Sequence, residues 1–160
     1  MRFRLIDRIV DIQPGVRITA VKALTGREDY LKDHFPLFPV MPGVLMLEAM
    51  YQAAAWLVRK TDNFGYALVT LKEARNVKYS DFVAPGQELV VSAEIFKQEG
   101  PLVTLKTSGV VNGETAVSAR LILERQHIAA DNPARAACDP YTRQRFQEIF
   151  NELYQPGVQT

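Results

Sequence analysis

Residues 34–52 read HFPLFPVMPGVLMLEAMYQ, and this stretch decides the fold. Its first half contains Pro36, Pro39 and Pro42, so it cannot form a regular helix. Pro42 suits the first turn of a helix, and residues 44–60 contain neither proline nor glycine. The pattern therefore predicts a proline-rich loop followed by a helix of about 18 residues.

The predicted helix is apolar on nearly every side. Only Glu48 and Gln52 interrupt its apolar surface before Arg59. A helix that is hydrophobic all round belongs in the interior of a protein, whereas a surface helix has one polar face. We therefore expect a buried central helix that carries one isolated carboxylate.

The rest of the chain up to residue 125 favours β-structure. Runs rich in β-branched and aromatic residues alternate with Gly, Pro and Asn-containing breaks, and Asn112-Gly113 is a strong hairpin signal. The predicted strands are 5–10, 17–23, 66–71, 74–79, 89–97, 102–111 and 114–124. Antiparallel strands with one long apolar helix near the start predict an α+β fold in which a sheet wraps around the helix.

The C-terminal part has a different character. Residues 126–140 are rich in small residues and predict a loop, and in residues 141–154 apolar side chains recur at near-helical spacing. These side chains are Tyr141, Phe146, Ile149, Phe150 and Leu153. We expect one domain over 1–125 and an extension over 126–160, whose amphipathic helix packs on the domain or on a neighbouring subunit.

Composition excludes several classes of protein. The chain has 160 residues, of which 48% are hydrophobic and 23% charged, so disorder and collagen-like structure are excluded. A formal net charge of +1 gives no general attraction to nucleic acid or to anionic membranes. No apolar run is long enough to span a membrane and the N-terminus does not resemble a signal peptide, so we expect a cytoplasmic protein. The single cysteine, Cys138, has no disulfide partner and no neighbouring histidine.

Three groups in residues 34–52 can act together in acid–base chemistry. Burial favours the neutral form of a carboxyl group, which is the form that donates a proton, so Glu48 is a candidate acid. His34 titrates in the range suited to a base. The helix N-terminus at Gly43 offers unpaired N–H groups to a substrate oxygen, and no side chain blocks the approach.

These residues alone leave the reaction open. Proton removal next to a carbonyl with loss of a β-hydroxyl would use this acid, base and N–H donor, and so would ester or thioester hydrolysis. Taken singly, a histidine before a proline-rich turn and one glutamate on a helix are more often structural than catalytic.

The stretch resembles the signature of the FabZ-type (3R)-hydroxyacyl-[acyl-carrier-protein] dehydratases, His-Phe-Pro-Gly-x-Pro-x-x-Pro-Gly-Val-Leu-x-x-Glu-Ala-x-x-Gln. Every defined position matches except one, where Leu37 replaces glycine. Weaker similarity includes residues 5–9 and 83–87 and extends over about residues 3–125. The tail from Gln126 has no counterpart.

The resemblance implies a hot-dog fold, in which an antiparallel sheet wraps around a long helix. It implies a homodimer whose sites each take the base His34 from one subunit and the acid Glu48 from the other. Many members of the family assemble further into trimers of dimers. The resemblance assigns the substrate carbonyl to the Gly43 backbone, the orientation of the histidine ring to the Val40 carbonyl, and support of the acid to Gln52, one turn further along the helix.

The resemblance also implies a partner and a substrate. The substrate would be an acyl chain on the phosphopantetheine arm of an acidic acyl carrier protein, without a metal or redox cofactor, and neither nucleic acid nor membrane would take part. The candidates for an apolar acyl tunnel are Phe35, Phe38, Met46, Met50 and Trp56. The candidates for a basic rim that receives the carrier are Arg59, Lys60, Lys72, Arg75 and Lys78.

Two other functions compete with dehydration. A hot-dog thioesterase or CoA hydratase is less favoured, because the whole histidine-to-glutamate signature with its prolines is that of the dehydratases. A catalytically silent subunit that binds acyl carrier protein or acts as a scaffold would not need both His34 and Glu48.

Overall fold

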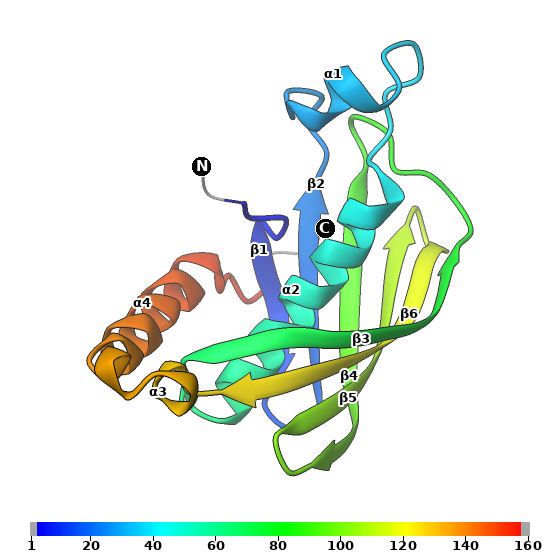
Figure 1. Cartoon of the computed structure of the whole chain (residues 1–160). Coiled ribbons are helices and arrows are strands. Elements are labelled where there is room, and N and C mark those ends of the chain that lie inside the picture. Colours follow the sequence, from blue (N-terminus) through cyan, green and yellow to red (C-terminus); the bar gives the residue numbers. More distant parts are fainter. Residues whose placement is uncertain (1–2, 158–160) are drawn as a thin grey trace.

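The computed structural model describes residues 3–157, which form one antiparallel sheet curled around a central helix (Figure 1). The strands are β1 (Arg8–Gln13), β2 (Arg17–Ala23), β3 (Leu68–Tyr79), β4 (Glu88–Glu99), β5 (Leu102–Val111) and β6 (Glu114–Gln126). The helices are α1 (Tyr30–His34), α2 (Gly43–Thr61), α3 (Ile128–Asp131), the 3₁₀ turn η1 (Pro133–Arg135) and α4 (Cys138–Leu153).

The sheet has six strands in the order β1-β2-β4-β5-β6-β3. All neighbours are antiparallel, as the hairpin signals predict. The turn between β5 and β6 is formed by Asn112 and Gly113, both with positive φ, which is the backbone that an Asn-Gly hairpin turn requires. Strands β1 and β3 are the two edges of the sheet.

Helix α2 lies in the hollow of the sheet, as its composition predicts (Figure 1). Pro42 immediately precedes its first residue, and the helix continues to Thr61 because no proline or glycine interrupts it. Met50, Ala53, Ala54 and Leu57 are completely buried in the core. The small alanine side chains let the helix approach the sheet closely.

Two predicted strands, 66–71 and 74–79, are one strand. Strand β3 runs unbroken from Leu68 to Tyr79 along β6, with register shifts after Leu71 and after Arg75. Asn76 takes a positive φ within the second irregularity. Such bulges bend a strand without ending it. The first strand also begins later than predicted, at Arg8.

The tail forms more helix than its composition predicts. Residues 126–140 contain α3, η1 and the start of α4, so the prediction of a loop is wrong there. Asp139 caps α3, because its carboxylate accepts hydrogen bonds from the N–H groups of Ile128 and Ala129. This contact links the start of α3 to the first turn of α4, eleven residues further along the chain.

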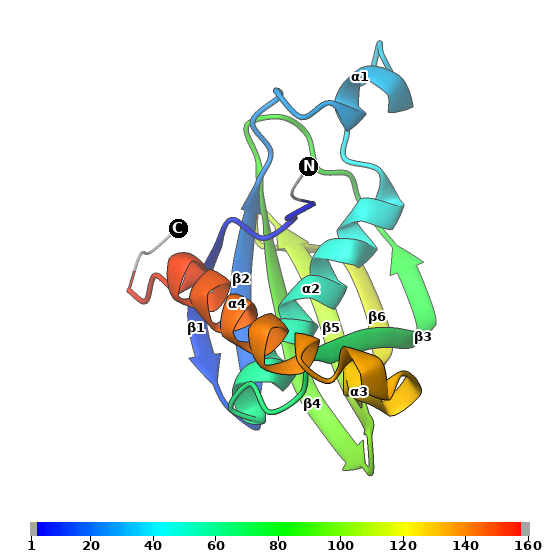
Figure 2. The same cartoon turned by 60° about the vertical axis from the view of Figure 1, so that its left-hand side comes forward.

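Helix α4 crosses over α2 beside the N-terminal segment (Figure 2). Phe150 and Leu153 are buried, and Trp56 of α2 lies 5.8 Å from Phe146 and 6.2 Å from Phe150 between ring centroids. Tyr141 was predicted on the apolar face of this helix, but it is 72% exposed. Within residues 3–157, no helix is long and apolar enough to cross a membrane.

Candidate active site

His34 is the last residue of the short helix α1, not part of a loop as predicted. A tight turn follows, in which the Phe38 N–H donates to the Phe35 carbonyl over 2.9 Å. Pro36 occupies the second position of this turn, where its fixed φ is favourable. The turn leaves the His34 side chain exposed, with its ring 4.2 Å from that of Phe35.

Leu37, the one departure from the family signature, is the third residue of this turn and is 100% exposed. Its φ is not among the positive values in the described chain, so its backbone stays in a region open to any residue. The turn therefore accommodates leucine without strain.

His34 lines a small cavity of about 70 Å³ at the N-terminus of α2. The other lining residues are Phe35, Val40, Met41, Gly43, Met46, Tyr79, Asp81 and Phe82. The Gly43 N–H has no hydrogen-bond acceptor among residues 3–157. A β-carbon at Gly43 would lie 3.0 Å from Tyr79 Cε1, so the glycine leaves room between the helix and this ring.

Glu48 lies on α2 and is half-buried, whereas the sequence analysis predicts a fully buried carboxylate. Its Oε1 accepts a hydrogen bond from Gln52 Nε2 over 2.9 Å. The same amide donates to the Phe3 carbonyl, and its oxygen accepts from the Leu5 N–H over 2.8 Å. Gln52 therefore ties Glu48 to the N-terminal segment of the chain.

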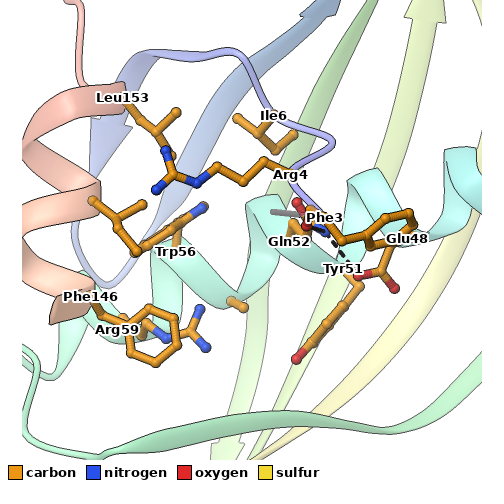
Figure 3. A pocket seen from close by; sticks show the side chains of 12 residues that line it. Phe3, Arg4, Ile6, Glu48, Tyr51, Gln52, Trp56, Arg59, Phe146 and Leu153 are labelled. Atoms are coloured by element: carbon orange, nitrogen blue, oxygen red, sulfur yellow. Dashed lines mark hydrogen bonds between the residues drawn. The ribbon is translucent and has the colours of Figure 1, made fainter. Parts of the chain in front are cut away.

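Glu48 faces a second cavity, of about 200 Å³, between α2, the N-terminal segment and α4 (Figure 3). Its lining residues are Phe3, Arg4, Ile6, Glu48, Tyr51, Gln52, Ala55, Trp56, Arg59, Phe146, Ile149 and Leu153. The Tyr51 hydroxyl donates to the Val69 carbonyl over 2.7 Å. Burial raises the pKa of Tyr51, the Arg59 charge lowers it and the Glu48 charge raises it, so this hydroxyl senses both charges.

The candidate base and the candidate acid line different cavities. The His34 cavity and the Glu48 cavity have no lining residue in common. The His34 cavity lies at the start of α2, and the Glu48 cavity extends from Glu48 toward the C-terminal half of that helix. Within one chain, the structure therefore does not bring the two side chains into one site.

The five residues predicted to line the acyl tunnel do not lie in one cavity. Phe35 and Met46 line the His34 cavity, and Trp56 lines the Glu48 cavity. Phe38 is 57% exposed and packs edge-on against Phe82, with centroids 5.6 Å apart. Met50 is completely buried and lines neither cavity. Val40 is buried and lines the His34 cavity, where its carbonyl accepts no hydrogen bond from His34.

The predicted basic rim is only partly free to receive a partner. Arg75 is paired with Glu73 at 2.7 Å, and Lys72 lies 3.6 Å from Glu124. Arg59 is only partly exposed to solvent, because its guanidinium lies against the rings of Trp56 and Phe146. Its position depends on α4, which the local pattern around Arg59 does not reveal.

The structure adds residues that the sequence analysis did not single out. Tyr79, Asp81 and Phe82 reach the His34 cavity from the end of β3 and the segment after it. Tyr51, three residues after Glu48 on α2, also lines the Glu48 cavity. The spacing on α2 could have indicated Tyr51, because residues three apart share a helix face.

Comparisons with known proteins identify the family of this chain. The family model of the FabA-like domain matches residues 1–120. A 3-hydroxyacyl-[acyl-carrier-protein] dehydratase FabZ from Lactococcus lactis subsp. cremoris is 42% identical over 120 residues, covering 74% of this chain and 82% of the relative. A FabZ from Variovorax paradoxus is 39% identical over 132 residues, covering 79% of this chain and 86% of the relative.

Solved structures support the fold. A chain of the dehydratase heterocomplex ApeI:P from Xenorhabdus doucetiae superposes with a TM-score of 0.64 at 18% identity, covering 79% of this chain and 85% of that one. An uncharacterized protein from Pyrococcus horikoshii gives a TM-score of 0.62, also at 18% identity, with coverage of 80% and 90%. The predicted hot-dog fold is confirmed, and the chain belongs to the FabA-like family, in which its curated relatives are FabZ-type 3-hydroxyacyl-[acyl-carrier-protein] dehydratases.

Proposed function

We propose that this protein dehydrates (3R)-3-hydroxyacyl chains carried on acyl carrier protein, giving trans-2-enoyl chains in fatty acid or related lipid biosynthesis. The FabA-like family match and two FabZ relatives of 39–42% identity support this reaction. The observation that carries the proposal is the placement of His34 beside the unpaired Gly43 N–H, while Glu48 faces a separate apolar cavity with Gln52 as its donor.

The proposed mechanism assigns one role to each group. His34 removes a proton from C2 of the chain, and the Gly43 N–H donates a hydrogen bond to the thioester oxygen as negative charge develops there. Glu48 gives a proton to the hydroxyl on C3. The C2–H and C3–O bonds break, the C2–C3 double bond forms, and water leaves. The reaction as proposed uses side chains, one backbone N–H and the phosphopantetheine arm of the substrate.

We further propose that two chains combine to complete each site. Phe35 and Phe82 line the His34 cavity, Phe38 packs against Phe82, and Val44 follows Gly43 on α2; each of these four side chains is half or more exposed. An apolar surface of this kind is typical of a protein interface. A second copy could cover it and place its own Glu48 opposite His34.

The two edges of the sheet indicate where a second subunit could pair with this one. Edge strand β1 is partly covered by the tail, because the Gln155 N–H donates to the Ile9 carbonyl over 2.9 Å. Edge strand β3 has twelve residues and pairs only with β6. An uncovered edge of that length is a surface for pairing with another chain. A dimer through β3, and a trimer of such dimers, are the assemblies we propose.

A direct assay tests the reaction. The purified protein, mixed with a 3-hydroxyacyl chain on acyl carrier protein, should give the enoyl product, detected by mass spectrometry of the carrier. Release of free carrier thiol without enoyl product would instead indicate a thioesterase. Turnover of neither kind, with retained binding of the acylated carrier, would indicate the silent scaffold.

Mixed oligomers test the shared site. His34→Ala and Glu48→Gln should each abolish turnover as pure proteins. Co-refolded mixtures of the two variants should recover about a quarter of the wild-type activity, because random pairing gives one intact site in half of the dimers, which contain two sites each. No recovery, with mixed dimers demonstrated by differently tagged chains, would show that both groups act within one subunit.

A further inference from the structure

The Glu48 cavity contains a positive charge that the proposed reaction does not use. Figure 3 shows Glu48 and Gln52 at one end of this cavity and Trp56, Arg59 and Phe146 at the other. Arg59 lies seven residues after Gln52 on α2, so both residues lie on the same face of the helix. Arginine side chains on a helix point back toward its N-terminus, which brings the guanidinium closer to Glu48 than the backbone spacing implies.

The Arg59 guanidinium packs against two aromatic rings. Its central carbon lies 3.9 Å from the Phe146 ring centroid and 5.1 Å from that of Trp56. Burial lowers the pKa of Arg59 to about 10, so the side chain remains charged at neutral pH. These contacts restrict the position of the guanidinium. Tyr51 is a hydrogen-bonding neighbour of the group, and the remaining N–H donors are available to a ligand.

These donors have no anionic partner among the residues that the structure describes. Arg59 Nε is buried without a hydrogen-bond acceptor, and within residues 3–157 no carboxylate lies within ion-pair distance of the side chain. The other cation of the cavity, Arg4, is paired with Glu152 at 3.1 Å. A charge that is partly removed from water and has no anion beside it is costly, so the site favours a ligand that supplies an anion.

The cavity is large enough for such a ligand. Its volume of about 200 Å³ exceeds the roughly 30 Å³ that one water molecule takes up in the liquid by several times. Its walls are mainly apolar, with Ile6, Ala55, Ile149 and Leu153 between the two polar ends. The combination suits a short hydrocarbon chain that ends in an anion.

We infer that this cavity binds a carboxylate at the far end of the acyl chain, with the Arg59 guanidinium as its partner. The inference rests on the proposed function, because it places the reacting carbon of the same chain at Glu48. The preferred substrate is then the thioester of a dicarboxylic acid rather than a chain that ends in a methyl group. A planar guanidinium binds a carboxylate through two parallel hydrogen bonds, and this geometry favours carboxylate recognition.

A binding experiment tests the inference without turnover. Trp56 is the only tryptophan of the chain and lines the cavity, so its fluorescence reports on ligands there. Octanedioate should bind at least about tenfold more tightly than octanoate, as expected for a hydrogen-bonded charge pair. Arg59→Met should remove this difference. The matched control Lys60→Met, which removes a neighbouring charge outside the cavity, should keep it.

The second anion on the substrate, the phosphate of the phosphopantetheine arm, is tested in the same way. Binding of octanedioate, followed by Trp56 fluorescence, should depend on Arg59. Binding of phosphopantetheine, measured in the same way, should not depend on Arg59. Arg59-dependent binding of phosphopantetheine without binding of octanedioate would overturn the inference. Equal binding of octanoate and octanedioate to the wild-type protein would also overturn it.

Turnover separates this inference from the proposed function. Two 3-hydroxyacyl chains of equal length on acyl carrier protein, one ending in carboxylate and one in methyl, should differ at least about tenfold in kcat/KM in favour of the carboxylate, and Arg59→Met should invert the order. If neither chain is dehydrated but octanedioate binding depends on Arg59, the proposed function fails and the carboxylate site stands. If the wild-type protein dehydrates the chain that ends in methyl as fast as, or faster than, the chain that ends in carboxylate, the carboxylate site fails and the proposed function stands. Should Arg59→Met not fold, Arg59→Lys, which keeps the charge and loses the paired donors, should show an intermediate preference.

Discussion

Gln52 Nε2 donates a hydrogen bond to Glu48 Oε1 over 2.9 Å, one helical turn away on α2. The same side chain accepts from the Leu5 N–H, so it holds the candidate acid and the N-terminal segment in fixed relation. Its position in the family signature is therefore explained by geometry. The carboxylate is oriented by a neighbour that is itself held by backbone groups.

Replacing Gln52 by methionine should lower kcat more than it raises KM. Methionine has a similar shape and no donor, so Glu48 loses its orienting bond, and about a tenfold loss in kcat is expected from one such bond. The measurement is steady-state kinetics on a 3-hydroxyacyl carrier substrate. Gln144→Met is the matched control, since that amide makes only an exposed contact on α4. An unchanged kcat in Gln52→Met would remove Gln52 from the positioning role.

Adding one methyl group at Gly43 should reduce turnover without unfolding the protein. The new β-carbon would lie 3.0 Å from Tyr79 Cε1, so the ring must move into the space beside the Gly43 N–H. We expect Gly43→Ala to lower kcat/KM about tenfold, which is less than the roughly 100-fold or greater loss from removing an oxyanion donor, because the Gly43 N–H itself is retained. Kinetics and thermal unfolding of the same sample check this. Combining it with Tyr79→Ala should relieve the crowding, and no recovery would show that the ring is not the cause.

The carboxylate of Glu28 should make the stability of the loop before α1 depend on pH. Burial alone would raise the pKa of Glu28, but hydrogen bonds from Thr25 and Gly26 outweigh this effect and hold the pKa below its ordinary value of 4.5. The charged form is therefore favoured by folding. Its contribution is present above pH 4.5 and is lost as the pH falls through the lower folded-state pKa.

Glu28→Gln tests that contribution. An amide has only one acceptor oxygen, so one donor in the loop loses its partner, and the free energy of unfolding at pH 7 should fall by about 1–3 kcal/mol. Denaturant unfolding across pH should show this difference shrink below pH 4.5, the ordinary pKa of the carboxyl group. Glu148→Gln, which breaks only a surface pair, should have little effect at any pH. A pH-independent difference would contradict the assignment.

Docking of α4 should be part of the cooperative fold. Phe150 is buried against Trp56 and Phe64, with ring centroids 6.2 Å and 5.7 Å away. Phe150→Ala should lower the free energy of unfolding by about 3–5 kcal/mol, the usual effect of deleting a core phenylalanine. Phe96→Ala, at a side chain that is mostly exposed on the sheet, should cost much less. A small loss with a separate early change in Trp56 fluorescence would show that α4 undocks on its own.

The sequence predicts the elements that depend on local pattern. The absence of proline and glycine after Pro42 indicates α2, and Asn112-Gly113 indicates the hairpin of β5 and β6. The sequence predicts two strands in place of β3, because Lys72 and Glu73 interrupt the alternation of apolar and polar residues. The bulge that accommodates them depends on pairing with β6, which no local pattern contains.

The candidate site was predictable in its chemistry and less so in its surroundings. His34, Gly43 and Glu48 stand out by residue type and spacing, and the roles assigned to them stay predictions. The half-buried state of Glu48 and the burial of Arg59 depend on where the N-terminal segment and α4 pack. Those contacts join parts of the chain that are far apart in sequence, so composition around each residue does not determine them.

Helix α4 has a consequence for how this protein can diverge from its relatives. The family match ends at residue 120, and α4, which supplies Phe146, Ile149 and Leu153 to the Glu48 cavity, begins at Cys138. One wall of the Glu48 cavity is thus encoded outside the stretch that the family model matches, while Trp56 and Arg59 lie inside that stretch. Substitutions in the tail can therefore reshape that wall while the residues from His34 to Glu48 stay unchanged.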